Sequence, residues 1–380
     1  MRLFHLSDLH LGKKLNEAPL LEDQRFLLAQ IVALVAEHKP DAVLIAGDVY
    51  DRPVPSADAV SLLDTFLTRL AELGAPVLLI SGNHDSAERL AFGAQLFSTR
   101  RVYVSPVFDR EHAAIAPVRF TDGHGAVCLW MLPFIKPAHV RAALPDLPCD
   151  TYTQAMQSVI GTLPIDPGER NVLLCHQYIT GGERAESEEI SVGGVDQVDA
   201  SVFAPFDYVA LGHLHRAQSV ARPTVRYCGS PMPYSFSEVK DHKGVTLVTL
   251  LGKGDVRLET LPLTPKRALR ELRGDYETLT LRKNYEHTAV DDYLHITLTD
   301  AYDVPDALAR LQSIYPNLLK LDYDNARTRG GPLNLTDAPE HASPLALLNS
   351  FYALQNGEPM NEEQRTYAQA ALERAWEGRL

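Results

Sequence analysis

The segment RLFHLSDLHLGK (Arg2–Lys13) begins with a short apolar run and ends in polar side chains that can bind a metal ion. Residues 2–6 fit a β-strand, and Asp8 and His10 follow that strand two positions apart. Residues two apart in an extended chain point to the same side, so a carboxylate and an imidazole would share one face. We interpret the segment as a sheet strand with polar chemistry at its carboxyl end.

The same arrangement recurs through residues 1–250, where short apolar runs alternate with amphipathic stretches. This alternation is typical of an α/β sheet protein. Apolar spacing predicts helices over Asp23–Glu37 and over Ser56–Leu73, the second with Ser56 as its N-cap. The predicted strands are Arg2–Leu6, Ala42–Ala46, Pro76–Ser81, Val127–Leu132, Asn171–Cys175, Tyr208–Leu211, Arg226–Cys228 and Val245–Thr249.

Five polar clusters share one feature, because each stands where an apolar strand run ends. They are Asp8-Leu9-His10, Gly47-Asp48, Gly82-Asn83-His84-Asp85, His176 and Gly212-His213-Leu214-His215. Taken singly, each has a plainer interpretation as a turn, a cap or a core histidine. Taken together, they predict a set of nitrogen and oxygen ligands at the carboxyl edge of a sheet, suited to manganese, iron(II) or zinc.

The types of side chain suggest how such a site would work. Two adjacent divalent ions can hold a phosphate and activate a water for in-line attack. Asp48 could bridge two ions through its two oxygens, and Asn83 supplies a neutral oxygen. We expect His84 to face the substrate as a proton donor or charge stabiliser, with Asp85 orienting its ring.

Composition limits the class of protein. The chain has 380 residues, 45% hydrophobic and 22% charged, which suits a globular protein of two or three domains. No apolar run approaches the ~20 residues of a membrane span, and no signal-peptide pattern begins the chain, so we expect a cytoplasmic protein with no membrane partner. Four scattered cysteines agree with a reduced compartment. The net charge, 36 − 49 = −13, argues against a protein that binds DNA through its own basic surface.

The character of the sequence changes near Leu261–Arg273, where prolines and basic residues suggest a domain boundary. Beyond it we predict strands at Tyr276–Leu281, Leu294–Thr299 and Leu318–Tyr323, with a helix at Pro305–Ile314. Residues Asn325–Ala342 resemble a linker. Two helices should follow, one opened by Ser343-Pro344 and one by a capping box at Asn361–Gln364.

The five clusters resemble the motifs of the calcineurin-like metallophosphoesterases. SDLHLGK (Ser7–Lys13), GDVYDR (Gly47–Arg52), FDYVALGHLHRAQ (Phe206–Gln218) and YCGSPMPYSFSEVKDHKGV (Tyr227–Val245) are similar to the SbcD-type nuclease subunits. The resemblance implies an α/β fold, a metallophosphoesterase β-sandwich flanked by helices at residues 1–264. It also implies a small α+β DNA-capping domain at 265–335, and a linker with partner-binding helices at 336–380.

The resemblance further implies two manganese ions, with other divalent ions also possible. Asp8, His10, Asp48 and His215 would hold one ion, while Asp48, Asn83, His176 and His213 would hold the other. His84 would be catalytic. The implied partners are DNA, an SbcC-type SMC-like ATPase and a second copy of the chain, which together would form a heterotetramer.

The implied function is that of the nuclease subunit of an SbcCD-type DNA repair complex, with 3′→5′ double-strand exonuclease and ATP-dependent endonuclease activity. Two alternatives remain open. A phosphatase or cyclic-nucleotide phosphodiesterase of the same superfamily would share the metal ligands but would not need the middle domain or the tail. A non-enzymatic scaffold would not need an intact His84.

Overall fold

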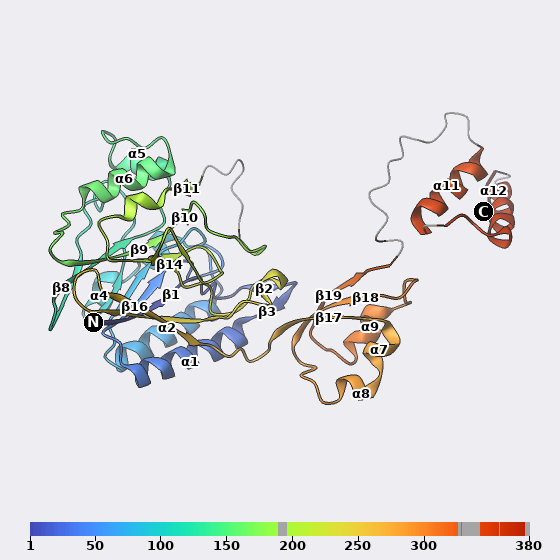
Figure 1. The fold of residues 1–380 in the computed structure, drawn as a ribbon, viewed down its shortest axis with the longest axis horizontal. Coiled ribbons are helices and arrows are strands. Elements are labelled where there is room, and N and C mark those ends of the chain that lie inside the picture. Colours follow the sequence, from blue (N-terminus) through green and yellow to red (C-terminus); the bar gives the residue numbers. More distant parts are fainter. Residues whose placement is uncertain (189–195, 326–327, 329–342, 357, 377–380) are drawn as a thin grey trace. The chain divides into compact units, whose positions relative to one another are not determined.

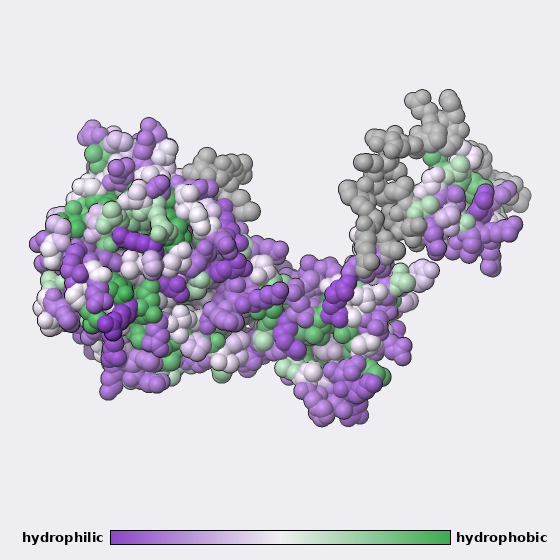
Figure 2. Space-filling view, viewed as in Figure 1, coloured by the Kyte–Doolittle hydropathy of each residue, from purple (hydrophilic) through white to green (hydrophobic). Residues whose placement is uncertain are grey.

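The computed structural model describes residues 1–380 except 189–195, 326–327, 329–342, 357 and 377–380, and it divides into two compact units (Figure 1). These are Met1–Ala268 and Leu269–Leu380, so the division falls after residue 268 where the sequence analysis placed it after 264. The predicted third segment groups with the second unit. Both units expose a largely hydrophilic surface with separate apolar patches (Figure 2).

The first unit is a sandwich of two six-stranded sheets. In order across the first sheet the strands are β16 (Val256–Pro262), β15 (Gly244–Leu250), β1 (Arg2–Leu6), β4 (Ala42–Ala46), β5 (Val77–Ile80) and β6 (Val102–Val104). The second sheet runs β13 (Gln218–Val220), β14 (Arg222–Tyr227), β12 (Tyr208–Gly212), β9 (Arg170–His176), β8 (Gly125–Leu132) and β7 (Val118–Asp122). Leu44 and Leu78 of the first sheet share a core with Leu129 and Leu174 of the second.

Helices cover the outer faces, which confirms the predicted helix-flanked sandwich. Against the first sheet lie α1 (Leu21–His38) and α2 (Ala57–Glu72). Helices α5 (Pro137–Ala143) and α6 (Tyr152–Thr162) pack on the second sheet, where Val140 and Met156 join Trp130 in a core. The remaining short elements are α3 (Ala87–Leu90), α4 (Ala94–Ser98), β2 (Lys14–Leu15), β3 (Ala18–Pro19), β10 (Tyr178–Ile179), β11 (Gln197–Val198), η1 (Ala200–Phe203) and η2 (Phe236–Glu238).

The parallel pairing of the central strands positions the functional site. Strands β1, β4 and β5 are parallel in one sheet, and β8, β9, β12 and β14 are parallel in the other. A strand buried on both faces needs a continuous apolar run, and AVLIA of β4 is fully buried. Parallel strands place their carboxyl ends along one edge of a sheet, and polar residues stand at that edge at the ends of β1, β4, β5, β9 and β12.

The second unit is a three-stranded parallel sheet, β17 (Leu269–Gly274), β18 (Tyr293–Leu298) and β19 (Leu318–Tyr323), with helices α7 (Tyr276–Thr280), α8 (Arg282–Tyr285) and α9 (Ala307–Gln312). The predicted strand at Tyr276–Leu281 is wrong, because that segment forms α7. Asp275 caps α7 by accepting from the Thr278 N–H at 2.7 Å, and this local bond favours a helix. The third strand is β17, whose residues the sequence analysis assigned in part to the domain boundary.

Two helices end the described chain, α11 (Pro344–Asn356) and α12 (Glu362–Trp376). The predicted caps are confirmed. Ser343 Oγ accepts from the Ala346 N–H, and Asn361 and Gln364 exchange two hydrogen bonds of 2.9 Å. Most of the predicted linker lies outside the described residues. Among the helices that are described, none has the length and hydrophobicity to cross a bilayer.

Candidate metal centre

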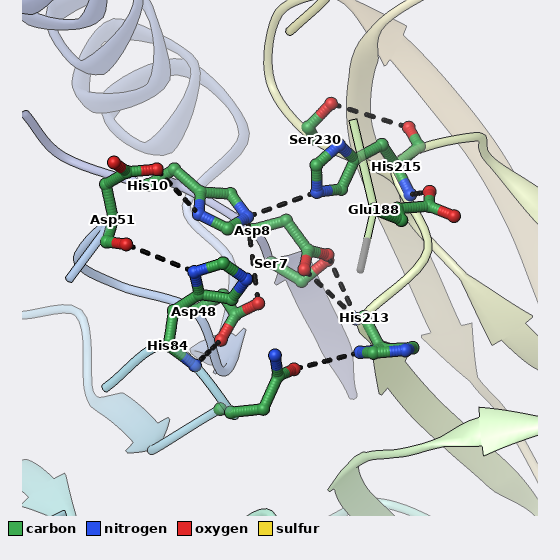
Figure 3. Close-up of polar contacts among 12 residues, drawn as sticks. Ser7, Asp8, His10, Asp48, Asp51, His84, Glu188, His213, His215 and Ser230 are labelled. Carbon is green, nitrogen blue, oxygen red and sulfur yellow. Dashed lines mark hydrogen bonds and ion pairs between the residues drawn. The ribbon is translucent and has the colours of Figure 1, made fainter. Parts of the chain in front are cut away.

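All seven predicted ligands and His84 meet where strands of the two sheets end. Figure 3 shows six of these side chains: Asp8, His10, Asp48, His84, His213 and His215. Asp8 and His10 follow β1, Asp48 follows β4, and Asn83 and His84 follow β5. The second sheet contributes the rest, since His176 ends β9 while His213 and His215 follow β12. The predicted closeness of these side chains is confirmed; their role as metal ligands stays a prediction.

The backbone is unusual at these strand ends. Four of the residues have positive φ angles: Asp8 (53°), His10 (42°), Asp48 (48°) and His213 (108°). Such values are uncommon for residues with a side chain and cluster at functional sites. The strand ends also approach closely, because a Cβ on Gly212 would lie 1.9 Å from Ala46 O. Glycine at position 212 therefore allows the two sheets to bring their loops together.

One group of ligand atoms forms what we call the His10 half-site, made of Asp8, His10, Asp48 and His215. His10 Nε2 lies 3.1 Å from His215 Nε2 and 3.6 Å from Asp48 Oδ2. Ligand atoms of Asp8, His10 and His215 all lie within 4.8 Å of one another. These residues come from both sheets, and each is buried.

A second group, the His176 half-site, comprises Asp48, Asn83, His176 and His213. Asn83 Oδ1 lies 3.0 Å from His176 Nε2 and 2.9 Å from His213 Nδ1. His176 Nε2 is also 3.3 Å from Asp48 Oδ2. The other ring nitrogen of His176, Nδ1, donates to Ala46 O at 2.8 Å, so in the neutral imidazole that a metal ion would bind, Nε2 carries the lone pair and faces the half-site.

Asp48 belongs to both half-sites through a single oxygen. Its Oδ2 faces His10 and His176, whereas Oδ1 accepts from the His84 main-chain N–H at 2.9 Å. One oxygen of Asp48 therefore faces both half-sites, and the hydrogen bond to the second oxygen holds the carboxylate in place.

The arrangement fits two divalent cations. Ligands about 2.1 Å from one ion, at right angles, stand about 3 Å apart, and the nitrogen and oxygen atoms of both half-sites are spaced near that value. Lone pairs at such distances repel each other unless a proton or a cation lies between them. The nitrogen, carboxylate and amide ligands suit manganese, iron or zinc.

The pKa shifts of the buried carboxylates and imidazoles also favour a bound cation. Burial raises the pKa of Asp8 to about 8 and lowers the pKa of His10 to about 4. Burial would also raise the pKa of Asp48, but attraction from His176 and His10 holds it well below its usual range. Charge on these groups is costly away from water, and a divalent cation between them would offset that cost.

The His84 ring is oriented by a main-chain carbonyl and not by Asp85 as expected. His84 Nδ1 lies 3.1 Å from the main-chain oxygen of Asp51, so this carbonyl orients the ring. The carboxylate of Asp85 accepts instead from the main-chain N–H groups of Gly82, Val49 and Tyr50, at 2.9 to 3.1 Å. The expectation that Asp85 orients His84 is therefore corrected: Asp85 fixes the loops after β4 and β5.

Sequence reasoning missed a layer of residues behind the ligands. Asp51 Oδ1 lies 3.6 Å from His10 Nδ1 and pairs with Lys13 at 2.9 Å. Ser187 Oγ lies 2.7 Å from His215 Nδ1, and Glu188 accepts from the His215 main-chain N–H at 2.5 Å. Asp51 stands in GDVYDR, which carried the resemblance, but nothing in the pattern indicated its contact.

The chain is similar in sequence to known protein families over most of its length. Residues 1–217 match the family model described as calcineurin-like phosphoesterase, and residues 265–356 match one described as type 5 capsule protein repressor C-terminal domain. A curated relative, the SbcD subunit of the nuclease SbcCD from Staphylococcus epidermidis, is 35% identical over 327 residues, covering 84% of this chain and 85% of the relative. A solved dimetal phosphatase from Danio rerio aligns with 13% identity and a TM-score of 0.44, over 70% of this chain and 98% of that one.

Proposed function

This chain belongs to the calcineurin-like phosphoesterase family and, within it, to the SbcD-type nuclease subunits, and we propose that it hydrolyses DNA phosphodiester bonds with two divalent metal ions. The observation that carries the proposal is the buried double half-site in a chain 35% identical to a nuclease subunit. The activities would be 3′→5′ exonuclease action on double strands and endonuclease action that depends on ATP and a partner, in DNA repair.

We assign Asp8, His10, Asp48 and His215 to one ion, and Asp48, Asn83, His176 and His213 to the other, as expected from the sequence. Manganese is our choice of metal, because the ligands are nitrogen and hard oxygen. When bound, such a pair supplies Lewis-acid stabilisation of the phosphate and an activated water. The chain's own contribution is to hold the ligands rigidly, which the carbonyl of Ala46 does for His176.

His84 is our candidate for the catalytic side chain. Its Nδ1 donates to Asp51 O, so Nε2 is the nitrogen available to the substrate. An imidazole fixed in this way can exchange a proton with the leaving oxygen or stabilise charge on the phosphate. Asp85 supports this role indirectly. Its carboxylate accepts from the Gly82 N–H and so fixes the loop that carries His84.

The direct test is cleavage by the purified full chain. Labelled duplex DNA with Mn²⁺ should be shortened from its 3′ ends, whereas a nucleotide monophosphate and a phosphoprotein should be poor substrates. The reverse preference would favour a phosphatase of the same family. Binding of two ions with no hydrolysis of any substrate would favour the non-enzymatic scaffold.

A partner ATPase of the SbcC type is the second part of the proposal, and α11 is the candidate contact. The side chains of Leu347 and Phe351 on this helix are 43% and 48% exposed, although both are large and apolar. A helix with exposed apolar anchors suits a partner's groove. We also assign residues 265–335 to DNA capping, and we place the protein in the cytoplasm, in line with its four free, buried cysteines.

A homodimer is the third part. Exposed apolar side chains gather on α2, on α4 and in the turn between α3 and α4, where Phe92 is 82% exposed and Leu96 of α4 is 75% exposed. A hollow of about 410 Å³ lies beside them, lined in part by Leu67, Leu96 and Phe97. Exposed apolar patches of this kind often mark protein interfaces. We propose that a second copy of the chain covers this face.

A further inference from the structure

A buried chain of polar side chains lies behind His215, on the side away from the ligand atoms. Lys243 Nζ donates to Glu238 Oε2 at 2.7 Å, Ser187 Oγ donates to Glu238 Oε1 at 2.6 Å, and Ser187 Oγ lies 2.7 Å from His215 Nδ1. Glu238 is 0% exposed and Lys243 is 8% exposed. Charged groups buried so deeply are normally paired, as these are.

Counting donors and acceptors shows which atom carries each hydrogen in the network formed by Lys243, Glu238, Ser187 and His215. Glu238 is surrounded by donors, because Oε1 also accepts from Ser235 at 2.9 Å and Oε2 faces the Lys243 ammonium. The carboxylate is therefore an acceptor only. A serine hydroxyl has one hydrogen, and Ser187 gives it to Glu238. Towards His215, Ser187 can then only accept, so the hydrogen of the imidazole must be on Nδ1.

We propose that Ser187 and Glu238 are positioning residues of the metal centre, which hold His215 in the tautomer and orientation that direct the Nε2 lone pair at the metal ion. This inference rests on the assignment of His215 as a ligand in the proposed function. Metal-binding histidines usually donate their second N–H to a carboxylate or carbonyl. Here a serine stands between the imidazole and the carboxylate.

The main chain of His215 is held from both sides as well. Its N–H donates to Glu188, and its carbonyl oxygen accepts from Lys243 at 2.7 Å and from the Ser230 N–H at 3.0 Å (Figure 3). Ser187 and Glu188 lie between β10 and β11. Through their contacts with His215, these two residues are a structural part of the His10 half-site.

The His176 half-site provides an internal comparison. His176 is backed by a main-chain carbonyl, and His213 Nε2 has no hydrogen-bond partner among the described residues. Loss of the Ser187 hydroxyl should therefore weaken one ion and spare the other. A change that merely loosened the fold would weaken both.

The first experiment is calorimetric titration of the metal-free full chain with Mn²⁺. Ser187→Ala should weaken one of the two sites by about 10- to 100-fold, the usual effect of removing an outer hydrogen bond from a metal ligand. Ser187→Thr keeps the hydroxyl and should bind as the wild type does. Ser237→Ala is the matched control, because Ser237 of η2 accepts from the Glu186 N–H, next to Ser187, at 3.1 Å but is exposed.

Two outcomes would overturn the proposal: wild-type titration of Ser187→Ala, or equal weakening of both sites with a lower melting temperature of the metal-free chain. Glu238→Gln should weaken the same single site as Ser187→Ala does. A second readout is the ¹⁵N spectrum of His215 without metal, where hydrogen on Nδ1 is expected and hydrogen on Nε2 would contradict it. Neither assay measures DNA cleavage, so a chain that passes both but cleaves no DNA would refute only the nuclease assignment.

Discussion

Replacing His84 by alanine tests whether this imidazole acts on the substrate or holds a metal ion. The hydrogen bond between His84 and Asp48 comes from the His84 main-chain N–H, which donates to Asp48 Oδ1 at 2.9 Å, while the His84 ring packs edge-on against His10. Alanine keeps that N–H, so the shared carboxylate should remain oriented. What is lost is the ring, which the Asp51 carbonyl holds with Nε2 available to the substrate.

The expected loss of rate follows from these separate roles of the His84 main-chain N–H and the His84 ring. A positioned acid or base typically contributes 10²- to 10⁴-fold to a rate, which corresponds to about 3 to 5 kcal/mol of barrier. We therefore expect His84→Ala to slow single-turnover cleavage of labelled duplex DNA by that factor at saturating Mn²⁺. Metal content, measured by elemental analysis, should stay at two ions per chain.

His112→Ala is the matched control, because His112 is exposed and pairs with Asp109 on the surface. It should leave both the rate and the metal content unchanged. A parallel loss of one ion and of activity in His84→Ala would refute the reasoning. In that case His84 would be a ligand, in the grouping with His10 and Asp48 that lies within 4.8 Å.

Four further changes test other parts of the structure. Asp48→Ala should remove both ions, because Oδ2 faces both half-sites; elemental analysis that finds both retained would contradict the bridge. Burial lowers the pKa of His5 to about 3, so between pH 6.5 and 4 His5 gains a proton in the unfolded chain but not in the folded one. The free energy of unfolding of the wild type, measured with urea, should therefore fall by about 3 kcal/mol more over this pH range than that of His5→Asn. Phe92→Arg should convert a dimer to a monomer in analytical ultracentrifugation, and an unchanged mass would exclude this face. A chain ending before Ser343 should still cleave short DNA but fail to retain the ATPase in a pull-down; continued binding would show that the tail is not the contact.

The sandwich could be predicted because its strands are buried on both faces. Such strands need continuous apolar runs, and the two runs Arg2–Leu6 and Ala42–Ala46 coincide with β1 and β4. The gathering of Asp8, His176 and the other strand-end residues could be predicted for the same reason, since parallel strands end along one edge.

What could not be predicted depends on contacts between distant segments. Ser187 and Glu238 are 51 residues apart, and neither lies at the end of a strand in the way the ligands do. Asp85 follows His84 directly, yet its carboxylate turns to main-chain groups of another loop, which no spacing rule indicates. The strand predicted at Tyr276–Leu281 failed because apolar spacing in six residues cannot separate a short helix from a strand, and the Asp275 cap decided the outcome.

The ion pairs made by the basic side chains bear on how so acidic a chain can act on DNA. The net charge is −13, and two basic side chains close to the metal centre, Lys13 and Arg184, have carboxylate partners. Lys13 pairs with Asp51 at 2.9 Å, and Arg184 pairs with Asp196 at 2.8 Å. These pairs leave little local positive charge for a phosphodiester.

Two divalent ions would add about four positive charges at the point of cleavage. That charge serves the chemistry but binds only one or two phosphates. Affinity for a long polyanion scales with the number of phosphates neutralised, so we expect it to come mainly from a partner. This charge balance supports the proposed division of labour between a nuclease subunit and an ATPase.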